Sequence, residues 1–219
     1  MSHEILARTF DQWAADGRDA GMEREHGNVA MQVLAQLGIR AGEQILDLGC
    51  GNGWATRLLA TSAPGVAAIG VDVSPKMIER AEAMHSLTIR ARYEIAAFEK
   101  LGFKDAKFDR LFSMEALYYA IDLERALCEA LRVLKPGGRA DVVVDFFTES
   151  PATAAWPAKT GLAMHYLSTA QWQAAFERAG FIEITATRVY EAKSSRPVDP
   201  SHAASKAAGS LWLTAKKRG

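Results

Sequence analysis

The stretch Ile45-Leu-Asp-Leu-Gly-Cys-Gly-Asn-Gly53 decides the fold. Its apolar run contains Asp47, glycines follow at positions 49, 51 and 53, and residues 54–62 then have the apolar spacing of a helix. This order predicts a strand, a tight glycine turn and a helix. Glycine adopts backbone angles that other residues avoid, and a helix start favours an anionic group. The loop is therefore predicted to bind a nucleotide-like ligand.

Short apolar strands alternate with helices along most of the chain, which predicts an α/β sandwich with a mostly parallel sheet. The last two strands have no long apolar helix between them and are expected to form an antiparallel pair. We predict a surface loop at 150–165, and leave open whether 203–208 forms a short helix or a mobile lid. The expected helices lie at 3–15, 22–37, 54–62, 75–84, 122–134 and 171–179, and the expected strands at 44–48, 67–71, 88–95, 108–113, 139–147, 181–191 and 211–216.

The composition excludes several classes of protein. The 219 residues carry 26 Lys+Arg and 26 Asp+Glu, a balance that disfavours nucleic acid and anionic membranes as partners. No segment has the length of apolar sequence that spans a membrane, and the N-terminus lacks the apolar core of a signal peptide. Cys50 and Cys128 suggest neither a disulfide framework nor a metal site. We expect a cytoplasmic protein without a bound metal.

An acidic residue strengthens the prediction of a nucleotide-like ligand. Asp72 ends the second expected strand, at the spacing of about 20 residues that suits a carboxylate binding ribose hydroxyls. A dinucleotide fingerprint would place its third glycine where Trp54 stands, and an indole would obstruct that close approach. The pattern favours a mononucleoside-type ligand over a nicotinamide dinucleotide.

Four motifs occur in the order of a known family. They are 47–53, Gly-Val-Asp-Val-Ser-Pro-Lys-Met at 70–77, Lys-Phe-Asp-Arg-Leu-Phe-Ser at 107–113, and Leu-Arg-Val-Leu-Lys-Pro-Gly-Gly at 131–138. Together they resemble the class I S-adenosylmethionine-dependent methyltransferases, in the small-molecule branch that includes ubiquinone and menaquinone biosynthesis enzymes.

The resemblance implies a Rossmann-like three-layer sandwich under an N-terminal helical cap. Its seven-stranded sheet would have the order 3-2-1-4-5-7-6, with strand 7 antiparallel. The whole chain, 1–219, would form one methyltransferase domain. Within it, 1–42 would be the cap, 43–149 the cofactor-binding half and 150–219 the substrate-side half.

The resemblance also implies a set of residues that bind S-adenosylmethionine. Asp47, Gly49 and Gly51 would hold the methionyl part of the cofactor, and Cys50 between the two glycines is counted with the cofactor-binding residues. Asp72 would accept hydrogen bonds from both ribose hydroxyls.

The adenine and sulfonium ends have implied contacts of their own. Met77 would pack on the adenine ring, and Val73 is a further cofactor-binding residue. Family members often carry an aspartate where this chain has Ala97, so backbone groups of Ala97 and Phe98 would hold the adenine, with Glu99 as a substitute carboxylate. Met114 would border the sulfonium.

The acceptor side is less defined by the sequence. We predict His165, Tyr118 and Asp145 as catalytic candidates, since a general base is needed wherever the acceptor must lose a proton. At most one of the adjacent Tyr118 and Tyr119 is expected to line the pocket. His26 and Glu115 are further candidates. Phe10 and Trp13 are expected to pack in the core of the cap.

These observations predict an enzyme that transfers a methyl group from S-adenosylmethionine to a small organic molecule. One alternative is a cofactor-binding module without catalysis, which the missing aspartate at Ala97 would suit. Another is an NAD-dependent oxidoreductase, which Trp54 disfavours. A nucleic-acid or protein methyltransferase is disfavoured by the charge balance, and by Ser113-Met-Glu-Ala116 where an Asn-Pro-Pro-Tyr-type signature would stand. The sequence leaves the acceptor and the oligomeric state open.

Overall fold

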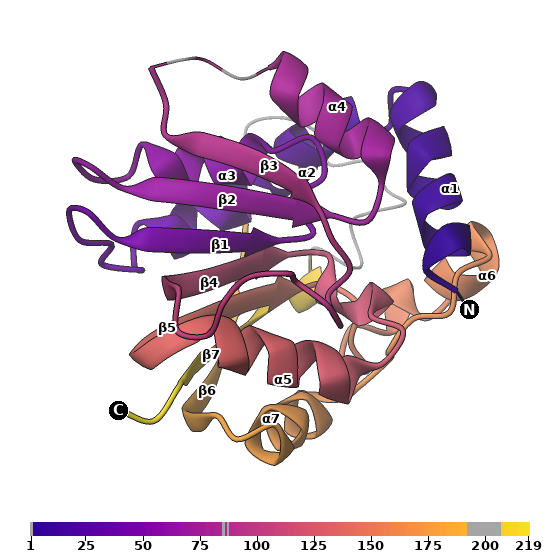
Figure 1. Cartoon of the computed structure of the whole chain (residues 1–219). Coiled ribbons are helices and arrows are strands. Elements are labelled where there is room, and N and C mark those ends of the chain that lie inside the picture. The colour runs from indigo at the N-terminus through magenta and orange to yellow at the C-terminus, as the bar shows by residue number, and fades with distance from the viewer. Residues whose placement is uncertain (1, 85, 87, 192–206) are drawn as a thin grey trace.

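The computed structural model describes residues 2–84, 86, 88–191 and 207–219, and in these residues a single seven-stranded sheet forms the centre of the molecule (Figure 1). The strands are β1 (Gln44–Leu48), β2 (Ala67–Asp72), β3 (Ala91–Ile95), β4 (Phe108–Met114), β5 (Leu134–Val144), β6 (Ile182–Val189) and β7 (Ser210–Lys216). The helices are α1 (His3–Ala15), α2 (Asp19–Leu34), α3 (Trp54–Ala60), α4 (Pro75–Ala83), α5 (Leu123–Val133), α6 (Trp156–Thr160) and α7 (Thr169–Arg178), with short 3-10 turns at Leu117–Tyr119 and Pro151–Thr153.

The strand order confirms the predicted topology. The order is β3-β2-β1-β4-β5-β7-β6, and β7 runs antiparallel to both of its neighbours. The other neighbouring strands pair in parallel. The order reverses between β1 and β4, the position at which open α/β sheets form a ligand-binding crevice.

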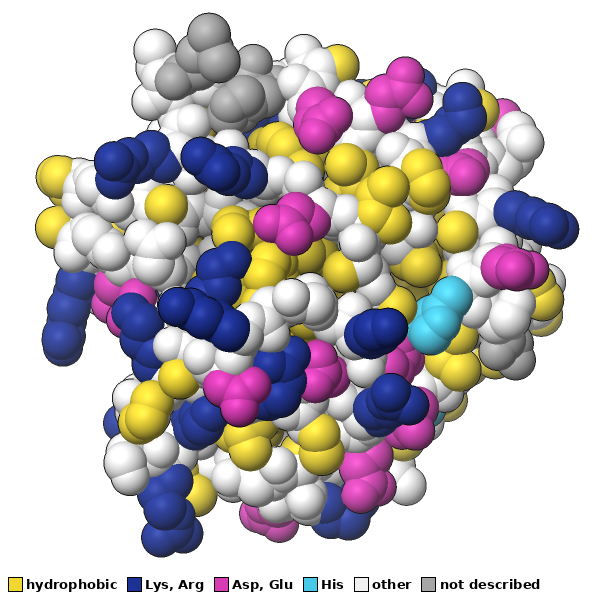
Figure 2. Space-filling model, in the orientation of Figure 1, with side chains coloured by type: hydrophobic (Ala, Val, Ile, Leu, Met, Phe, Trp, Pro, Cys, Tyr) yellow, Lys and Arg dark blue, Asp and Glu magenta, His cyan; other side chains and the backbone are white. Residues whose placement is uncertain are grey.

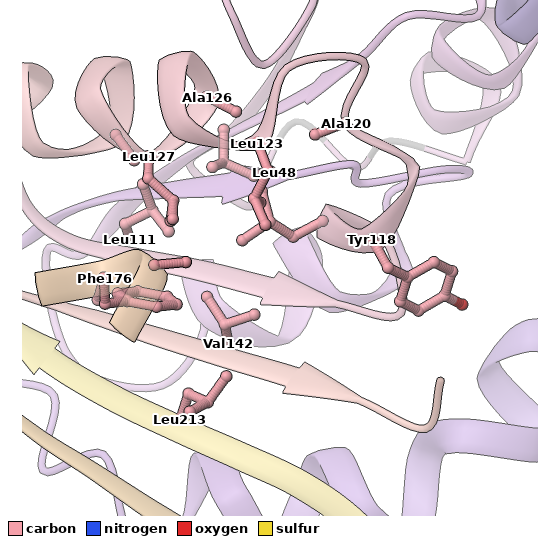
Figure 3. Close-up of a cluster of buried hydrophobic side chains, with 14 of the residues drawn as sticks. Leu48, Leu111, Tyr118, Ala120, Leu123, Ala126, Leu127, Val142, Phe176 and Leu213 are labelled. Carbon is pink, nitrogen blue, oxygen red and sulfur yellow. The ribbon is translucent and has the colours of Figure 1, made fainter. Parts of the chain in front are cut away.

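Side chains alternate between the two faces of each strand, so the sheet packs against helices on both faces and three layers result. Leu111 of β4 packs in the hydrophobic cluster beneath α5 and α7, whereas the next residue, Phe112, packs in a second cluster against α2 and α3. Successive side chains of a strand point to opposite faces, so a strand buried on both faces is apolar throughout. Figure 3 shows part of the first cluster, in which Leu127 of α5 and Phe176 of α7 lie over Leu111.

Helix α1 lies beyond the carboxyl ends of the central strands (Figure 1). Asp11 Oδ1 accepts a hydrogen bond from Ser74 Oγ at 2.6 Å and another from the Lys76 N–H at 3.0 Å. These contacts hold α1 against the first turn of α4, where free N–H groups favour a carboxylate. The predicted N-terminal cap is therefore fixed over the edge of the sheet that binds ligands in this architecture.

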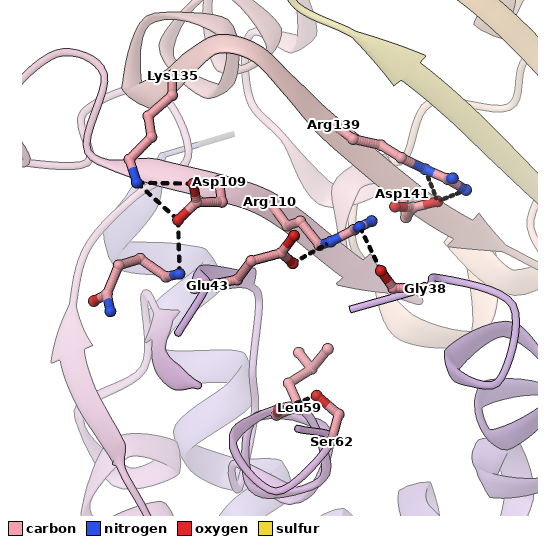
Figure 4. Close-up of polar contacts among 10 residues, drawn as sticks. Gly38, Glu43, Leu59, Ser62, Asp109, Arg110, Lys135, Arg139 and Asp141 are labelled. Atoms are coloured by element: carbon pink, nitrogen blue, oxygen red, sulfur yellow. Dashed lines mark hydrogen bonds and ion pairs between the residues drawn. The ribbon is translucent and has the colours of Figure 1, made fainter. Parts of the chain in front are cut away.

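Ion pairs fix the opposite ends of the central strands (Figure 4). Asp109, near the start of β4, accepts from Lys135 Nζ at 2.8 Å and from the Gln44 N–H at 2.8 Å. Arg110 donates to Glu43 at 2.6 Å. This cluster is remote from the strand ends beneath α1, so its residues serve below as controls.

Several predicted boundaries were wrong. Helix α2 begins at Asp19 and ends at Leu34, earlier at both ends than the predicted 22–37. Strand β5 begins at Leu134, directly after α5, because Leu134 pairs with Phe108. The Lys-Pro-Gly-Gly segment thus lies inside the start of β5, and the strand ends at Val144, before the predicted 147.

The predicted loop at 150–165 contains the 3-10 turn Pro151–Thr153 and helix α6, both too short to produce a readable helical period. The prediction for 203–208 falls largely outside the described residues. No helix among the described residues has both the length and the apolar character needed to cross a lipid bilayer.

Candidate functional site

A cavity of about 1080 Å³ opens at the carboxyl ends of the parallel strands. Gly49 after β1, Asp72 at the end of β2, Met114 at the end of β4 and Asp145 after β5 all line it. Helices α1 and α2 supply the facing wall, including Phe10. Its volume lies slightly above the usual range for small-molecule sites, roughly 300–1,000 Å³, which leaves room for a donor and an acceptor together.

The glycine turn lies in this cavity with the geometry that its sequence predicts. Gly49 and Gly51 have φ angles of +73° and +52°, in the left-handed region that disfavours residues with a side chain. The N–H groups of Gly49 and Cys50 donate to Val71 O at 2.8 and 3.0 Å, which ties the turn to β2. A Cβ at Gly49 would lie 2.2 Å from the Ala116 Cβ, whereas one at Gly51 would meet only Met22 Sδ at 3.6 Å. Close packing against Ala116 requires a glycine at position 49, whereas at position 51 it is the backbone angle that favours glycine.

Asp47 lies behind the turn and does not line the cavity. Its side chain is buried, and its Oδ2 accepts a hydrogen bond from Thr56 Oγ1 at 2.6 Å. Burial is the main reason that the pKa of Asp47 rises from 3.8 to about 7, and the nearby Asp72 adds to the rise. The expectation that Asp47 touches the methionyl group is thus not supported by its position. Asp47 instead joins the end of β1 to helix α3 on either side of the turn.

Replacing Asp47 with asparagine should raise the free energy of unfolding at pH 8. The pKa of Asp47 is raised in the folded state, so the native protein loses stability as the pH rises from about 4 to about 7. An asparagine cannot ionise and its oxygen can still accept from Thr56. We expect Asp47→Asn to be about 2–4 kcal/mol more stable than the wild type at pH 8, by urea unfolding, with the difference closing toward pH 4.

The matched control is Asp109→Asn, for which the sign is opposite. Although burial opposes it, hydrogen bonds from Lys135 and the Gln44 N–H hold the pKa of Asp109 below its usual value. This variant should lose stability at pH 8. An Asp47→Asn protein no more stable than the wild type at pH 8 would show that burial of the Asp47 charge carries little cost.

Asp72 has the position predicted for a ribose-binding carboxylate. It lines the cavity and is 8% exposed; Oδ2 accepts from the Gly51 N–H at 3.0 Å and Oδ1 from the Ser74 N–H at 2.9 Å. Burial raises its pKa from 3.8 to about 6, against the opposing effect of these N–H donors. Val73 and Met77 line the cavity beside it.

The segment after β3 forms another wall. Ala97 and Phe98 line the cavity, and the Phe98 ring lies 3.2 Å from the position of a Cβ on Gly49. The Glu99 carboxylate is occupied by other groups. Its Oε1 accepts from the N–H groups of Ile121 and Asp122, and its Oε2 lies 2.8 Å from His3 Nε2. Glu99 therefore holds local backbone and α1, and is not free to replace the missing aspartate.

The carboxyl ends of β4 and β5 bring four polar side chains together. Glu115 has a φ of +53°; its Oε2 accepts from the Tyr118 hydroxyl at 3.0 Å and its Oε1 from the Asp145 N–H at 2.6 Å. His26 Nδ1, from α2, lies 3.9 Å from Asp145 Oδ2. Burial, and then the Asp145 charge, raise the pKa of Glu115 well above its usual value. Burial likewise raises the pKa of Tyr118, with Glu115 adding to the rise.

Aromatic side chains surround this polar group. Tyr118 and Tyr119 both line the cavity, with ring centroids 4.6 Å apart, so the prediction that at most one would do so was wrong. They lie in a 3-10 turn, in which adjacent side chains need not point to opposite sides as in a strand. Phe10 and Trp13 pack edge to face as the cap prediction expected, but they also line the cavity.

His165 is not among the residues that line the cavity. Its N–H donates to Tyr118 O at 2.9 Å, and its Nε2 lies 2.8 Å from Ala120 O. The expectation that His165 acts on the acceptor is not supported by this position. The residue supports the turn that carries Tyr118. Sequence reasoning also missed Met22 and Trp156, which reach the cavity from α2 and α6 and belong to no recognisable motif.

Charge on the molecular surface agrees with the balanced composition. The face shown in Figure 2 carries acidic as well as basic side chains, with hydrophobic surface visible between them. That face therefore lacks the single-sign field that is typical of nucleic-acid binding.

Comparison with known proteins relates this geometry to one family. Residues 46–141 match the family model described as a methyltransferase domain. The chain is 34% identical over 149 residues to an O-methyltransferase, resE, of Aspergillus sclerotiorum, covering 65% of this chain and 56% of that protein. It is 33% identical over 140 residues to the 27-O-demethylrifamycin SV methyltransferase of Amycolatopsis mediterranei (strain S699), covering 63% of this chain and 51% of that protein. The chain thus spans about half the length of these curated relatives.

A solved structure matches over nearly the whole chain. The matching chain comes from a structure described as the complex between the Haloferax volcanii Trm112 methyltransferase activator and "the putative methyltransferase". The two chains are 30% identical, the TM-score is 0.89, and the match covers 96% of this chain and 98% of that one. The similarity therefore includes the helical cap and the last strands, beyond the four sequence motifs.

Proposed function

Because this chain belongs to the class I S-adenosylmethionine-dependent methyltransferases, we propose that it transfers a methyl group from S-adenosylmethionine to a small organic molecule. The observation that carries the proposal is the shared cavity. It joins the glycine turn and Asp72 on one side to the polar group of Tyr118 and Asp145 on the other. A donor and an acceptor bound there would lie in contact, shielded from solvent by α1 and α2.

The cavity suits the cofactor by its chemistry as well as its volume. Asp72 presents a buried carboxylate to accept hydrogen bonds from ribose hydroxyls, and Val73 and Met77 supply apolar surface for the adenine. Gly49, Cys50 and Gly51 leave the backbone open to the methionyl part.

The remaining cofactor contacts come from two further segments. Backbone groups of Ala97 and Phe98 would hold the polar edge of the adenine, and Met114 would border the sulfonium. Asp47 would act only indirectly, by fixing the turn.

The protein's own contribution to the chemistry is orientation and proton removal. When bound, S-adenosylmethionine supplies a methyl group that is already activated by its sulfonium. Holding the acceptor in line can contribute up to roughly 7–11 kcal/mol of the barrier. Tyr118 and Asp145, with Glu115 and His26 beside them, are positioned to orient an acceptor and to take its proton, a role worth about 10²–10⁴-fold in rate.

The domain boundaries and the location are parts of the same proposal. Residues 1–42 would cover the site, 43–149 would hold the donor, and 150–219 would complete the acceptor side. A cytoplasmic location is supported by the two free cysteines, Cys50 and Cys128, since thiols persist in reducing compartments.

The experiment is transfer of a labelled methyl group. Purified protein is incubated with methyl-labelled S-adenosylmethionine and a pool of small metabolites, RNA and protein, which are then separated. The protein is tested alone and with a Trm112 homologue from the same genome, because the Haloferax volcanii relative was solved with that activator. Label should appear in the small-molecule fraction. Label in RNA or protein alone would overturn the acceptor class, and cofactor binding without any transfer would favour the non-catalytic module.

A further inference from the structure

Three side chains with metal-binding atoms converge in the cavity from separate parts of the chain. His26 comes from α2, Glu115 from the segment after β4, and Asp145 from the segment after β5. One ligand atom from each, an imidazole nitrogen and two carboxylate oxygens, lie within 4.8 Å of one another. The fold thus places a nitrogen and two oxygens around one point of the cavity wall.

The charges of this group are not balanced by the protein. Among the described residues, neither carboxylate forms an ion pair with a lysine or arginine, and the charged partner of Asp145 is His26 at 3.9 Å. Asp145 Oδ1 is buried and has no hydrogen-bond partner within the described part of the chain. Both carboxylates are partly buried, and two adjacent carboxylates that are partly removed from water repel each other and lose hydration unless a cation compensates them.

We propose that His26, Glu115 and Asp145 bind a divalent metal ion. Carboxylate oxygens with one imidazole nitrogen suit ions such as Mg²⁺, Mn²⁺ and Zn²⁺. A neutral imidazole can also accept a hydrogen bond from an ammonium group, so an ammonium ligand is the alternative that the test must separate from a metal. Three protein ligands leave coordination positions that face the cavity, where an oxygen atom of the acceptor can bind. That last role rests on the proposed methyl transfer, whereas metal binding itself does not.

His26, Glu115 and Asp145 are all acceptor-side candidates from the sequence, but no motif marks them as metal ligands, and from the sequence alone no metal is expected. Positions 26, 115 and 145 have no recognisable ligand spacing, because each lies on a different element. Only the placement of α2 over the ends of β4 and β5 brings the three together.

The test is titration of the metal-free protein of 219 residues with Mn²⁺, Mg²⁺ and Zn²⁺ in separate calorimetry experiments. For Mn²⁺, the loss of the free-ion electron paramagnetic resonance signal gives a second readout. We expect one saturable site per chain, weakened at least about tenfold in both Asp145→Asn and His26→Gln, since each removes one ligand. Glu25→Gln is the matched control, because Glu25 lines the same cavity outside the group and should leave metal affinity unchanged.

Three results would overturn the proposal. These are no saturable binding of any of the three ions at millimolar concentration, equal weakening by Glu25→Gln, or saturable binding of ethylammonium in place of the metals. Binding of S-adenosylhomocysteine is measured on the same preparations. If the cofactor binds and the metals do not, only the metal site is wrong, whereas the reverse result would contradict the proposed function and leave the metal site standing.

Discussion

Replacing Asp72 with asparagine is expected to weaken S-adenosylhomocysteine binding by about 10- to 100-fold at pH 8. The carboxylate presents charged acceptors to the ribose hydroxyls, and hydrogen bonds to a charged group contribute about 1.5–3 kcal/mol each. Asparagine keeps the size of the side chain and one acceptor oxygen, so the contacts with the Gly51 and Ser74 N–H groups can partly persist. Calorimetry of both proteins measures the change in dissociation constant, and urea unfolding shows whether the variant remains folded.

The pH dependence of binding separates this role from a structural one. The pKa of Asp72 is about 6 in the unliganded protein, so the wild type should lose affinity as the pH falls below 6 and the carboxylate takes up a proton. Asp72→Asn should show a weaker dependence over the same interval. Asp109→Asn, a carboxylate change at the remote ends of the strands, should leave binding unchanged. Equal affinities of the wild type and Asp72→Asn at pH 8 would remove Asp72 from the cofactor site.

Replacing Gly49 with alanine is expected to destabilise the fold by roughly 2–5 kcal/mol. Its φ of +73° adds about 1–2 kcal/mol of backbone strain for a residue with a side chain. The new methyl group would also lie 2.2 Å from the Ala116 Cβ and 3.2 Å from the Phe98 ring, and overpacking of this kind costs about 1–3 kcal/mol. If the variant folds, urea unfolding measures the loss in free energy of unfolding directly. If no variant protein is found in the soluble fraction, the loss is at the upper end of this range or beyond it.

Gly51→Ala is the matched control for this change. Gly51 also has a positive φ, but a methyl group there meets only Met22 Sδ at 3.6 Å. We expect a loss of about 1–2 kcal/mol, from backbone strain alone. If both variants lost the same stability, the packing of the turn against Ala116 and Phe98 would not be what requires glycine at position 49.

The parts of the site that could be predicted are those next to their strands in the sequence. Gly49, Gly51 and Asp72 follow or end apolar strands, and parallel strands bring their carboxyl ends to one edge of the sheet, so sequence order alone places them together. The strand order followed from the family resemblance, which the seven-stranded topology confirmed.

The acceptor side could not be predicted in the same way. His26 reaches the cavity only because α2 crosses the strand ends, a packing relation that no local pattern encodes. His165 was selected for its chemistry, although its backbone and ring contact the turn behind Tyr118. Asp47 packs against Thr56 of α3 because side chains alternate along β1, so a residue near the end of a strand can face the core instead of the cavity.

Calorimetric titration of the wild-type protein with S-adenosylhomocysteine is the most direct test of the central claim, which is that the cavity beneath α1 and α2 is a methyl-donor site. The account predicts saturable binding at one site per chain, retained in Asp109→Asn and weakened in Asp72→Asn. NADH should neither bind nor compete, because Trp54 stands where a dinucleotide site needs glycine. No saturable binding of S-adenosylhomocysteine at millimolar concentration by the folded protein would contradict the account.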